Sequence, residues 1–138
     1  DLVDKYWGRR ARYSYPYRSL QKSGAVLAFG SDGPIDRIDP LWNIYCAVTR
    51  KRPADGCKLY PIERLNVAEA IRATTIDSAY AVGREDELGS ISVGKYADIV
   101  ILEEDPYQIE PEKIPSVKVV ATLVEGEFVY GDENFEIW

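Results

Sequence analysis

Asp32 is the residue of this sequence with the clearest capacity for acid–base chemistry. It follows a short apolar run, Ala25–Phe29, within the loop Gly30–Pro34. A carboxylate at the end of a buried strand can accept a proton from a water molecule and return it to a leaving group. An aspartate before glycine and proline is also common turn chemistry, and from these residues alone we favour the turn. Ser31 and Gly33 are interpreted first as loop geometry and second as substrate contacts.

Two other sets of charged residues invite a functional interpretation. Arg50, Lys51 and Arg52 form a basic run that could meet an anionic substrate, but we expect a solvated helix end beside its own carbonyl groups. The acidic turn Glu103–Asp105 could bind a divalent cation, although a solvated turn before Pro106 is the simpler expectation. Neither set is predicted to be a site.

Four tyrosines gather before the apolar run: Tyr6, Tyr13, Tyr15 and Tyr17. Rings that pack between helices with the hydroxyl in water are commoner than rings that stack on a ligand, so we expect packing. Asp98 lies at a turn-to-strand junction, where we expect it to hydrogen-bond the Gly94–Lys95 backbone. We therefore interpret Asp98 as a structural residue.

The composition narrows the class of protein. A chain of 138 residues with 46% hydrophobic residues suits a globular domain, and a net charge of −6 argues against nucleic acid as a partner. Because no apolar run approaches the roughly 20 residues that cross a bilayer, we predict no membrane association. Cys46 and Cys57 lie in unlike contexts, which favours reduced thiols and a cytoplasmic location over a disulfide.

Two residue types are absent. The chain has no histidine, so the commonest transition-metal ligand is lacking and any metal chemistry must take its ligands from elsewhere. The chain also has no methionine, so Asp1 is not a translation start as written and we expect a fragment or a processed product.

Hydrophobic periodicity and capping residues predict several helices. We expect a helix over Tyr6–Ser23 that is broken near Pro16 and stops at Gly24, and a second over Leu41–Arg50. Asn66 and Glu69 have the spacing of a capping box, which predicts a helix that Thr74–Thr75 should weaken. A further turn or two is expected over residues 76–82.

The remaining segments predict strands. Ala25–Phe29 is typical of a strand buried on both faces, as in a parallel sheet. After Leu88 the pattern becomes that of strands, with alternation over Gly89–Val93 and a buried strand over Ala97–Leu102. Val117–Val124 and Glu127–Tyr130, joined by Glu125–Gly126, predict a hairpin.

Three segments in this order resemble one known family. Phe29–Pro34 with Ala47–Arg50, then Gly89–Leu102 followed by Asp105–Pro106, and finally Val124–Tyr130 are similar to the last part of the amidohydrolase superfamily, closest to its family 3. The resemblance covers nearly the whole chain. With it, Asp32 becomes a candidate catalytic residue as well as a turn-former.

The resemblance implies an α/β fold: the terminal βα portion of a (β/α)8 barrel followed by part of a small β-sandwich. Residues 1–87 would hold the end of the barrel, with 25–30 as its last strand, and residues 88–138 the later sandwich strands. Because catalytic groups of such barrels collect at the carboxyl ends of the strands, Asp32 would lie at the mouth of the barrel.

The chemistry implied by the resemblance is hydrolysis of carbon–nitrogen bonds of small molecules, in non-peptide amides or cyclic amides, by a water molecule activated on a divalent metal, expected to be zinc. Asp32 would accept and return the proton, and is also a possible weak metal ligand, with Ser31 and Gly33 as substrate contacts. The other metal ligands are absent here, so we expect this chain alone to bind no metal and to be inactive.

Two further expectations concern the chain by itself. The alternative function is a non-catalytic binding or scaffold module built on the strand-rich part. A lone barrel strand and half a sandwich would leave unpaired strand edges, so we expect the isolated chain to self-associate. The sequence specifies neither the substrate nor the number of metal ions.

Overall fold

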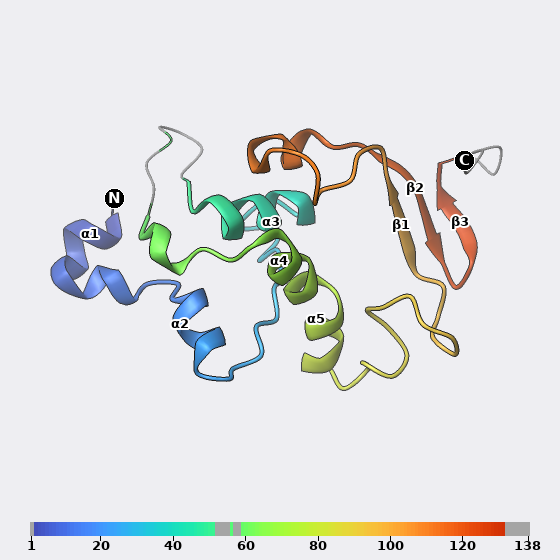
Figure 1. The fold of residues 1–138 in the computed structure, drawn as a ribbon, viewed down its shortest axis with the longest axis horizontal. Coiled ribbons are helices and arrows are strands. Elements are labelled where there is room, and N and C mark those ends of the chain that lie inside the picture. The colour runs from blue at the N-terminus through green and yellow to red at the C-terminus, as the bar shows by residue number, and fades with distance from the viewer. Residues whose placement is uncertain (1, 52–55, 57–58, 132–138) are drawn as a thin grey trace.

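The computed structural model describes residues 2–51, 56 and 59–131 of the chain. Short helices gather on one side of the molecule and a three-stranded sheet lies at the other end, with α3 and α4 between them (Figure 1). The helical elements are α1 (Leu2–Trp7), η1 (Gly8–Tyr13), α2 (Tyr17–Lys22), α3 (Pro40–Thr49), η2 (Pro61–Glu63), α4 (Val67–Thr74), α5 (Ile76–Ala81) and η3 (Pro111–Ser116). The strands are β1 (Ile99–Leu102), β2 (Val119–Val124) and β3 (Glu127–Tyr130).

The break predicted near Pro16 is confirmed. The chain leaves η1 at Ser14, which is extended, and Tyr15 has φ 52°, outside the right-handed helical region. Pro16 then precedes α2, as expected of a residue that cannot continue a helix through its own nitrogen. The helix α2 ends before Gly24, whose φ of 90° lies in the region that glycine enters most easily.

The helix predicted over residues 41–50 is α3, and its ends follow from local chemistry. The carboxylate of Asp39 accepts hydrogen bonds from the amides of Leu41 (3.0 Å) and Trp42 (3.4 Å), while Pro40 occupies the first helical turn. At the other end Arg50 takes a left-handed conformation, with φ 55°. The C-terminal cap is thus an arginine where glycine is commonest.

The capping box predicted at Asn66 is confirmed: its side chain accepts from the Glu69 amide at 2.8 Å, and the Glu69 carboxylate accepts from the Asn66 amide at 2.7 Å. The helix is interrupted at Thr75, again as predicted, and α5 follows. The interruption matters because the Ala73 carbonyl accepts from the amide of Phe29 at 2.9 Å and from the hydroxyl of Ser78 at 2.8 Å. The carbonyl group freed by the helix break therefore binds the end of the apolar run 25–29.

The strand predicted over residues 25–30 is not observed. The run is extended and lies beside the junction between α4 and α5, but it pairs with no strand among the described residues. Nor is it buried on both faces, since Val26 is 51% exposed. A strand needs a hydrogen-bonded neighbour, and the described part of the chain supplies only a helix end at Phe29.

The sheet is an antiparallel meander in the order β1-β2-β3. The hairpin predicted between β2 and β3 is confirmed, and its two turn residues, Glu125 and Gly126, both have positive φ (51° and 87°), the geometry that suits the strand twist. The strand predicted from residue 97 begins at Ile99. Gly89–Val93 is an exposed loop rather than a strand, because its alternating Ile91 and Val93 meet no apolar surface in the described structure.

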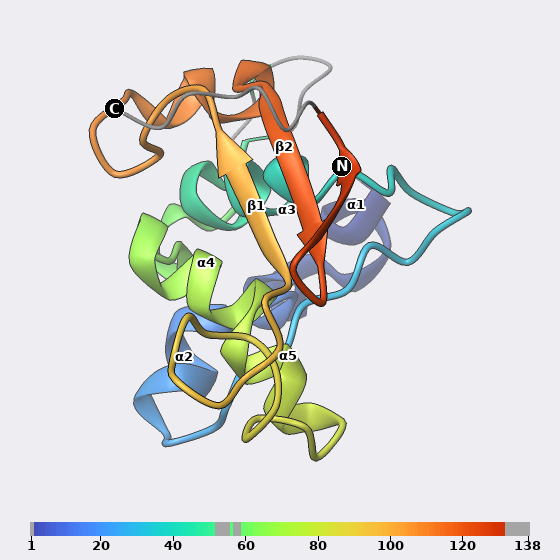
Figure 2. The ribbon, with the colours of Figure 1, turned by 90° about the vertical axis from the view of Figure 1, so that its right-hand side faces the viewer.

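The buried core lies between α3 and α4 and receives one residue from η3. Its members are Ile44, Ala47, Val48, Leu65, Ala70 and Ile114. Because Ile114 enters from η3, which runs along α3 in Figure 1, the segment between β1 and β2 is packed onto the helices. The sheet lies in front of α3 and α4 when the molecule is turned (Figure 2). No helix among the described residues is long and apolar enough to span a membrane.

Candidate functional site

Asp32 lies in an exposed turn after the extended run. Its φ is 54°, and its carbonyl oxygen accepts hydrogen bonds from the amides of Ile35 (2.9 Å) and Asp36 (3.4 Å). The amide of Gly33 donates to the hydroxyl of Ser31 at 3.3 Å. The backbone of the loop is therefore a turn, as its sequence suggests, and the turn leaves Asp32 exposed to solvent.

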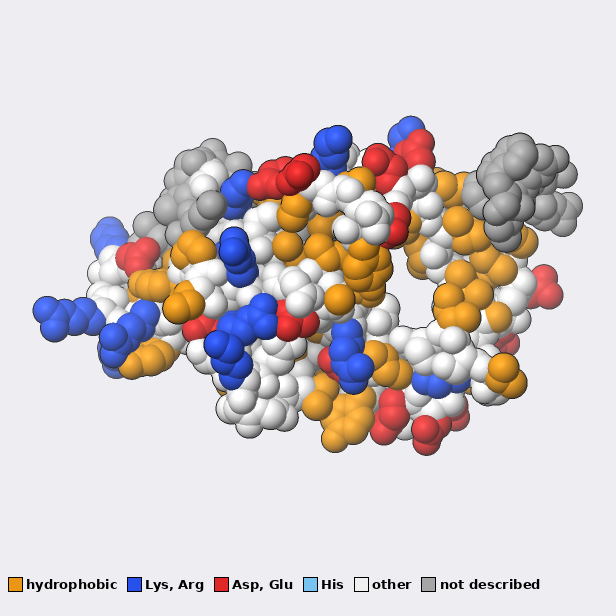
Figure 3. All heavy atoms as spheres, in the orientation of Figure 1, with side chains coloured by type: hydrophobic (Ala, Val, Ile, Leu, Met, Phe, Trp, Pro, Cys, Tyr) orange, Lys and Arg blue, Asp and Glu red, His pale blue; other side chains and the backbone are white. Residues whose placement is uncertain are grey.

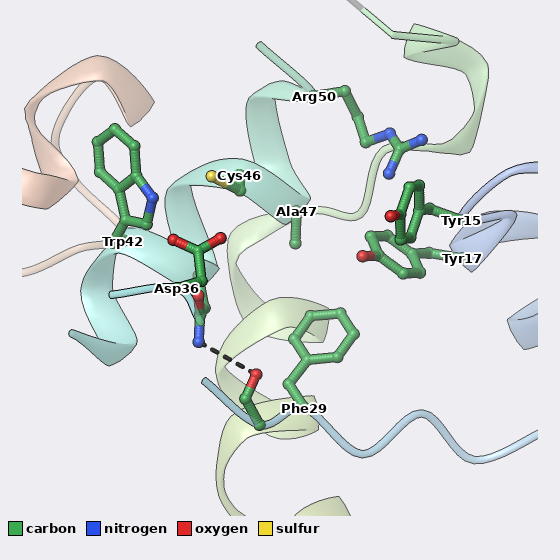
Figure 4. A pocket seen from close by; sticks show the side chains of 10 residues that line it. Tyr15, Tyr17, Phe29, Asp36, Trp42, Cys46, Ala47 and Arg50 are labelled. Carbon is green, nitrogen blue, oxygen red and sulfur yellow. Dashed lines mark hydrogen bonds between the residues drawn. The ribbon is translucent and has the colours of Figure 1, made fainter. Parts of the chain in front are cut away.

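A pocket of about 230 Å³ lies beside this loop and is lined by Gly30, two residues before Asp32. Its apolar walls are the rings of Tyr15, Tyr17, Phe29 and Trp42 with the methyl group of Ala47. Its polar groups are Asp36, Asn43, Cys46 and Arg50. The amide nitrogen of Asn43 donates to the Gly30 carbonyl at 3.3 Å, which fixes α3 against the loop (Figure 4).

Arg50 forms one end of the pocket and is only 7% exposed. Its Nε donates to the carbonyl of Leu59 at 3.1 Å and its Nη2 to the carbonyl of Ser14 at 3.4 Å. The guanidinium lies 4.9 Å from the ring centre of Tyr17 and 5.9 Å from that of Tyr15. Burial lowers the pKa of Arg50 from its ordinary value. That ordinary value is so high that the guanidinium still carries its charge at neutral pH.

The prediction of a solvated basic helix end is therefore wrong for Arg50. The rings of Tyr15 and Tyr17 shield its guanidinium from water. The charge pattern around Arg50 could not predict this, because both tyrosines lie 33 or more positions away in the sequence. Lys51 does follow the simpler expectation in part, since its ammonium pairs with Glu112 on the surface. Arg52 lies outside the described residues.

The four tyrosines differ in burial. Tyr6, Tyr13 and Tyr15 are 70%, 61% and 57% exposed, so the prediction that they pack between helices is wrong for them. Tyr17 packs its ring on Phe29, with 5.2 Å between centroids, and burial raises the pKa of its hydroxyl. Tyr15 and Tyr17 thus supply an aromatic wall beside a cation.

The opposite end of the pocket holds Asp36, Trp42 and Cys46 (Figure 4). Burial raises the pKa of the Cys46 thiol, and the nearby Asp36 carboxylate raises it further, so the thiol is protonated at neutral pH. The guanidinium of Arg37 lies 4.5 Å from the ring centre of Trp42. Cys46 is a free cysteine, while Cys57 lies outside the described residues.

The residues available for a metal ion are few. Within residues 2–51, 56 and 59–131, no group of three or more histidine, cysteine or acidic side chains is placed to hold one. In the acidic turn, Glu103 approaches Lys118 at 3.6 Å and Asp105 accepts from the Tyr107 amide at 2.9 Å. The described residues therefore do not form a metal centre by themselves.

Asp98 has a structural role, but with a different partner from the one predicted. Its carboxylate accepts from the amide of Glu125 at 2.8 Å, and the Gly126 amide donates to the Ala97 carbonyl at 3.1 Å. Asp98 thus holds the hairpin turn instead of the Gly94–Lys95 backbone. The sheet brings together residues 27 positions apart, which the local sequence does not reveal.

The chain matches the family described as "Amidohydrolase family" over residues 2–130. It is 40% identical over 132 residues to the protein LONG AFTER FAR-RED 3 of Arabidopsis thaliana, covering 94% of this chain and 22% of that protein. It is 34% identical over 116 residues to an N-substituted formamide deformylase of Arthrobacter pascens, covering 84% of this chain and 21% of the relative. The chain belongs to the amidohydrolase family.

Two solved structures are similar to this chain in fold. An uncharacterised metal-dependent hydrolase of Pyrococcus horikoshii OT3 is similar with a TM-score of 0.67 and 28% identity, over 80% of this chain and 24% of the hydrolase. An amidohydrolase of Thermotoga maritima MSB8 shares the fold with a TM-score of 0.60, over 86% of this chain and 26% of that structure. The chain spans about a quarter of the length of the relatives it matches.

Several pocket residues were not singled out from the sequence. Trp42 and Cys46 lie four residues apart and so share one face of α3, a spacing that marks a common surface, and Arg50, noted earlier only as part of a basic run, caps the end of that helix. Asp36 carries no such signal, since it lies in an irregular loop. The predicted site residues Ser31, Asp32 and Gly33 do not line the pocket themselves. They lie near it because they directly follow Gly30, which does.

Proposed function

We propose that this segment belongs to a metal-dependent hydrolase that cleaves carbon–nitrogen bonds of small molecules, with Asp32 as the group that accepts and returns a proton. The observation that carries the proposal is the position of Asp32, in an exposed turn that directly follows the extended run and adjoins a pocket. An exposed carboxylate can accept a proton from the attacking water and deliver it to the leaving nitrogen.

The architecture that suits this role is a (β/α)8 barrel in the whole protein. Residues 1–87 would complete the barrel, with residues 25–30 paired to strands outside this segment, and residues 88–138 would complete a small β-sandwich. The exposure of Val26 supports the pairing, because an extended apolar run without a sheet neighbour leaves backbone and side chains uncovered. Asp32 would then lie at the carboxyl end of a barrel strand, where such enzymes carry their catalytic groups.

The metal would take its ligands from parts of the protein outside this segment. The described residues hold no suitable group, and the whole chain contains no histidine. Zinc would polarise the substrate and lower the pKa of water, and Asp32 would contribute at most one weak ligand. We expect this segment alone to bind no metal and to be inactive.

The substrate class follows from the relative that removes the formyl group from N-substituted formamides. An N-substituted formamide has a small carbonyl carbon to be attacked and a larger group on nitrogen to be bound. Ser31 and Gly33, on either side of Asp32, would contact the reacting end through the hydroxyl and the backbone. A free, protonated Cys46 suits a cytoplasmic protein, and isolated segments are expected to self-associate through uncovered strand edges.

The test is the whole protein with Asp32→Asn, assayed for formate release from a panel of N-substituted formamides. Loss of the proton acceptor should lower kcat by about 10²-fold to 10⁴-fold with an unchanged thermal midpoint. Asp86→Asn, which alters another exposed turn aspartate, is the matched control and should retain activity. Equal turnover by the two variants would remove Asp32 from the mechanism.

A further inference from the structure

The guanidinium of Arg50 is a buried cation without a carboxylate beside it. Among the described residues, no carboxylate oxygen lies within the 4.0 Å of an ion pair with Arg50. The nearest acid that influences it is Glu63, whose oxygens already accept from the amide (2.8 Å) and hydroxyl (2.6 Å) of Ser19. Buried charges in proteins are normally paired, so this end of the pocket is electrostatically incomplete.

Arg50 also keeps hydrogen-bonding capacity. A guanidinium has five N–H donors in a planar fork. The donations to the Leu59 and Ser14 carbonyls use Nε and one hydrogen of Nη2, and a further donor is used by the Tyr17 hydroxyl, which leaves two. The fork matches the two oxygens of a carboxylate. In Figure 4 the guanidinium lies beside the rings of Tyr15 and Tyr17, so a bound carboxylate would have an aromatic wall next to it.

The rest of the pocket sets the kind of group that would carry the carboxylate. Phe29 and Ala47 lie between the two ends, and they offer apolar surface and a ring face instead of further donors. Such walls favour a flat apolar group. The Asp36 carboxylate at the far end would repel an anion, so the carboxylate of a ligand can occupy only the Arg50 end.

We propose that this pocket is a substrate subsite for an aromatic carboxylate, with the carboxylate bound to Arg50 and the ring held against Phe29 and Tyr17. The proposal deepens the proposed function and rests on it, because the pocket adjoins the loop of Asp32. Gly30 lines the pocket, and two peptide units separate the Cα atoms of Gly30 and Asp32 by at most about 7.6 Å. One substrate can therefore span the subsite and the reacting carboxylate.

The test uses a pair of substrates that differ only in the carboxylate: N-formyl-L-phenylalanine and N-(2-phenylethyl)formamide. The whole, metal-loaded protein should have a kcat/KM at least about tenfold higher for the acid, the size of a charge-assisted hydrogen bond. Arg50→Gln should abolish this preference and change kcat/KM for the neutral formamide less than about threefold. Arg50→Lys, which keeps the charge and loses the fork, should retain part of the preference.

A purely structural Arg50 would lower both values together, and that result would overturn the subsite. So would a wild-type protein that shows no preference for the acid, a result that requires no variant to fold. Another segment of the whole protein that places its own acidic side chain on Arg50 would give this second outcome.

Binding separates failure of the subsite from failure of the proposed function. Calorimetry on the Asp32→Asn protein compares 3-phenylpropionate with 3-phenylpropan-1-ol, neither of which can be hydrolysed. Binding of the acid at least about tenfold tighter, lost in Asp32→Asn/Arg50→Gln, supports the subsite even where no formamide is cleaved. Equal binding of acid and alcohol overturns the subsite even where formamides are cleaved.

Discussion

The helical region and the three-stranded sheet bury their apolar residues to very different extents. Between α3 and α4, Leu65 and Ile114 are almost completely inaccessible to water. In the sheet, Val100, Phe128, Val129 and Tyr130 are all exposed, and Ala121 alone of the strand residues is buried. Figure 3 shows hydrophobic side chains over both regions, including a broad group of them on the sheet.

The difference indicates which parts of the segment already bury their apolar surface. The apolar faces of α3 and α4 pack on one another and on η3, and Leu27 and Phe29 pack against this core, whereas Val26 and several apolar residues of the sheet remain exposed. Contiguous exposed apolar surface marks a place where other protein is expected to pack. The stability of this segment should therefore depend on the helical core. Shortening the exposed apolar side chains of the sheet should cost little as long as no other protein segment packs on them.

The most direct test of this contrast is a pair of truncations. Leu65→Ala should lower the free energy of unfolding by about 2–5 kcal/mol, because it removes a 2% exposed side chain and leaves a cavity. Val129→Ala, at a 61% exposed position of β3, should change it by less than about 0.5 kcal/mol. Urea denaturation measures both. A Val129 effect as large as that of Leu65 would show that the sheet face is covered.

The junction between the two regions depends on Gly89. Its φ is 81°, and a Cβ there would lie 2.6 Å from the Cα of Ile76 at the start of α5. Gly89→Ala should therefore cost about 2–4 kcal/mol through backbone strain and overpacking. Gly94→Ala is the control, with φ 93° and open space, and should cost about 1 kcal/mol. Equal thermal midpoints of the two variants would contradict the close approach.

A smaller effect is expected at Glu63, which joins η2 to α2. Hydrogen bonds from the Ser19 side chain and amide lower the pKa of its carboxyl, which is only 8% exposed. The ionised form is therefore favoured in the folded state, so this stabilisation is complete above the ordinary pKa near 4.5 and is lost as pH falls through the lowered folded value.

Glu63→Gln should accordingly destabilise the protein by about 1–2 kcal/mol at pH 7, and by progressively less below about pH 4. Denaturation midpoints at a series of pH values measure the difference. Glu103→Gln, at an exposed position directly after β1, is the comparison and should have an effect within about 0.5 kcal/mol at every pH. A Glu63 effect independent of pH would assign its role to packing.

Features written into a few neighbouring residues were predictable from the sequence. The capping box at Asn66, the break at Pro16 and the Glu125–Gly126 hairpin turn depend on groups at most three residues apart. The family, too, followed from short segments in their correct order. In each case the relevant hydrogen bonds are local, so their donors and acceptors can be identified before the fold is known.

Features that depend on distant partners were not predictable. Residues 25–29 have the composition of a strand, but a strand exists only where a second one pairs with it. Arg50 is buried by Tyr15 and Tyr17 across more than thirty residues, and Asp98 reaches Glu125 only because the sheet forms. The role of Asp32 belongs to the same group, because it depends on what faces the loop.

The interruption of the helix at Thr75 connects a feature predictable from local sequence with the loop that carries Asp32. A continuous helix would keep the Ala73 carbonyl for its own ladder, whereas here that oxygen receives the amide of Phe29. This hydrogen bond fixes Phe29, three residues before Asp32, against the end of α4, so the loop that carries Asp32 starts from a position set by that helix.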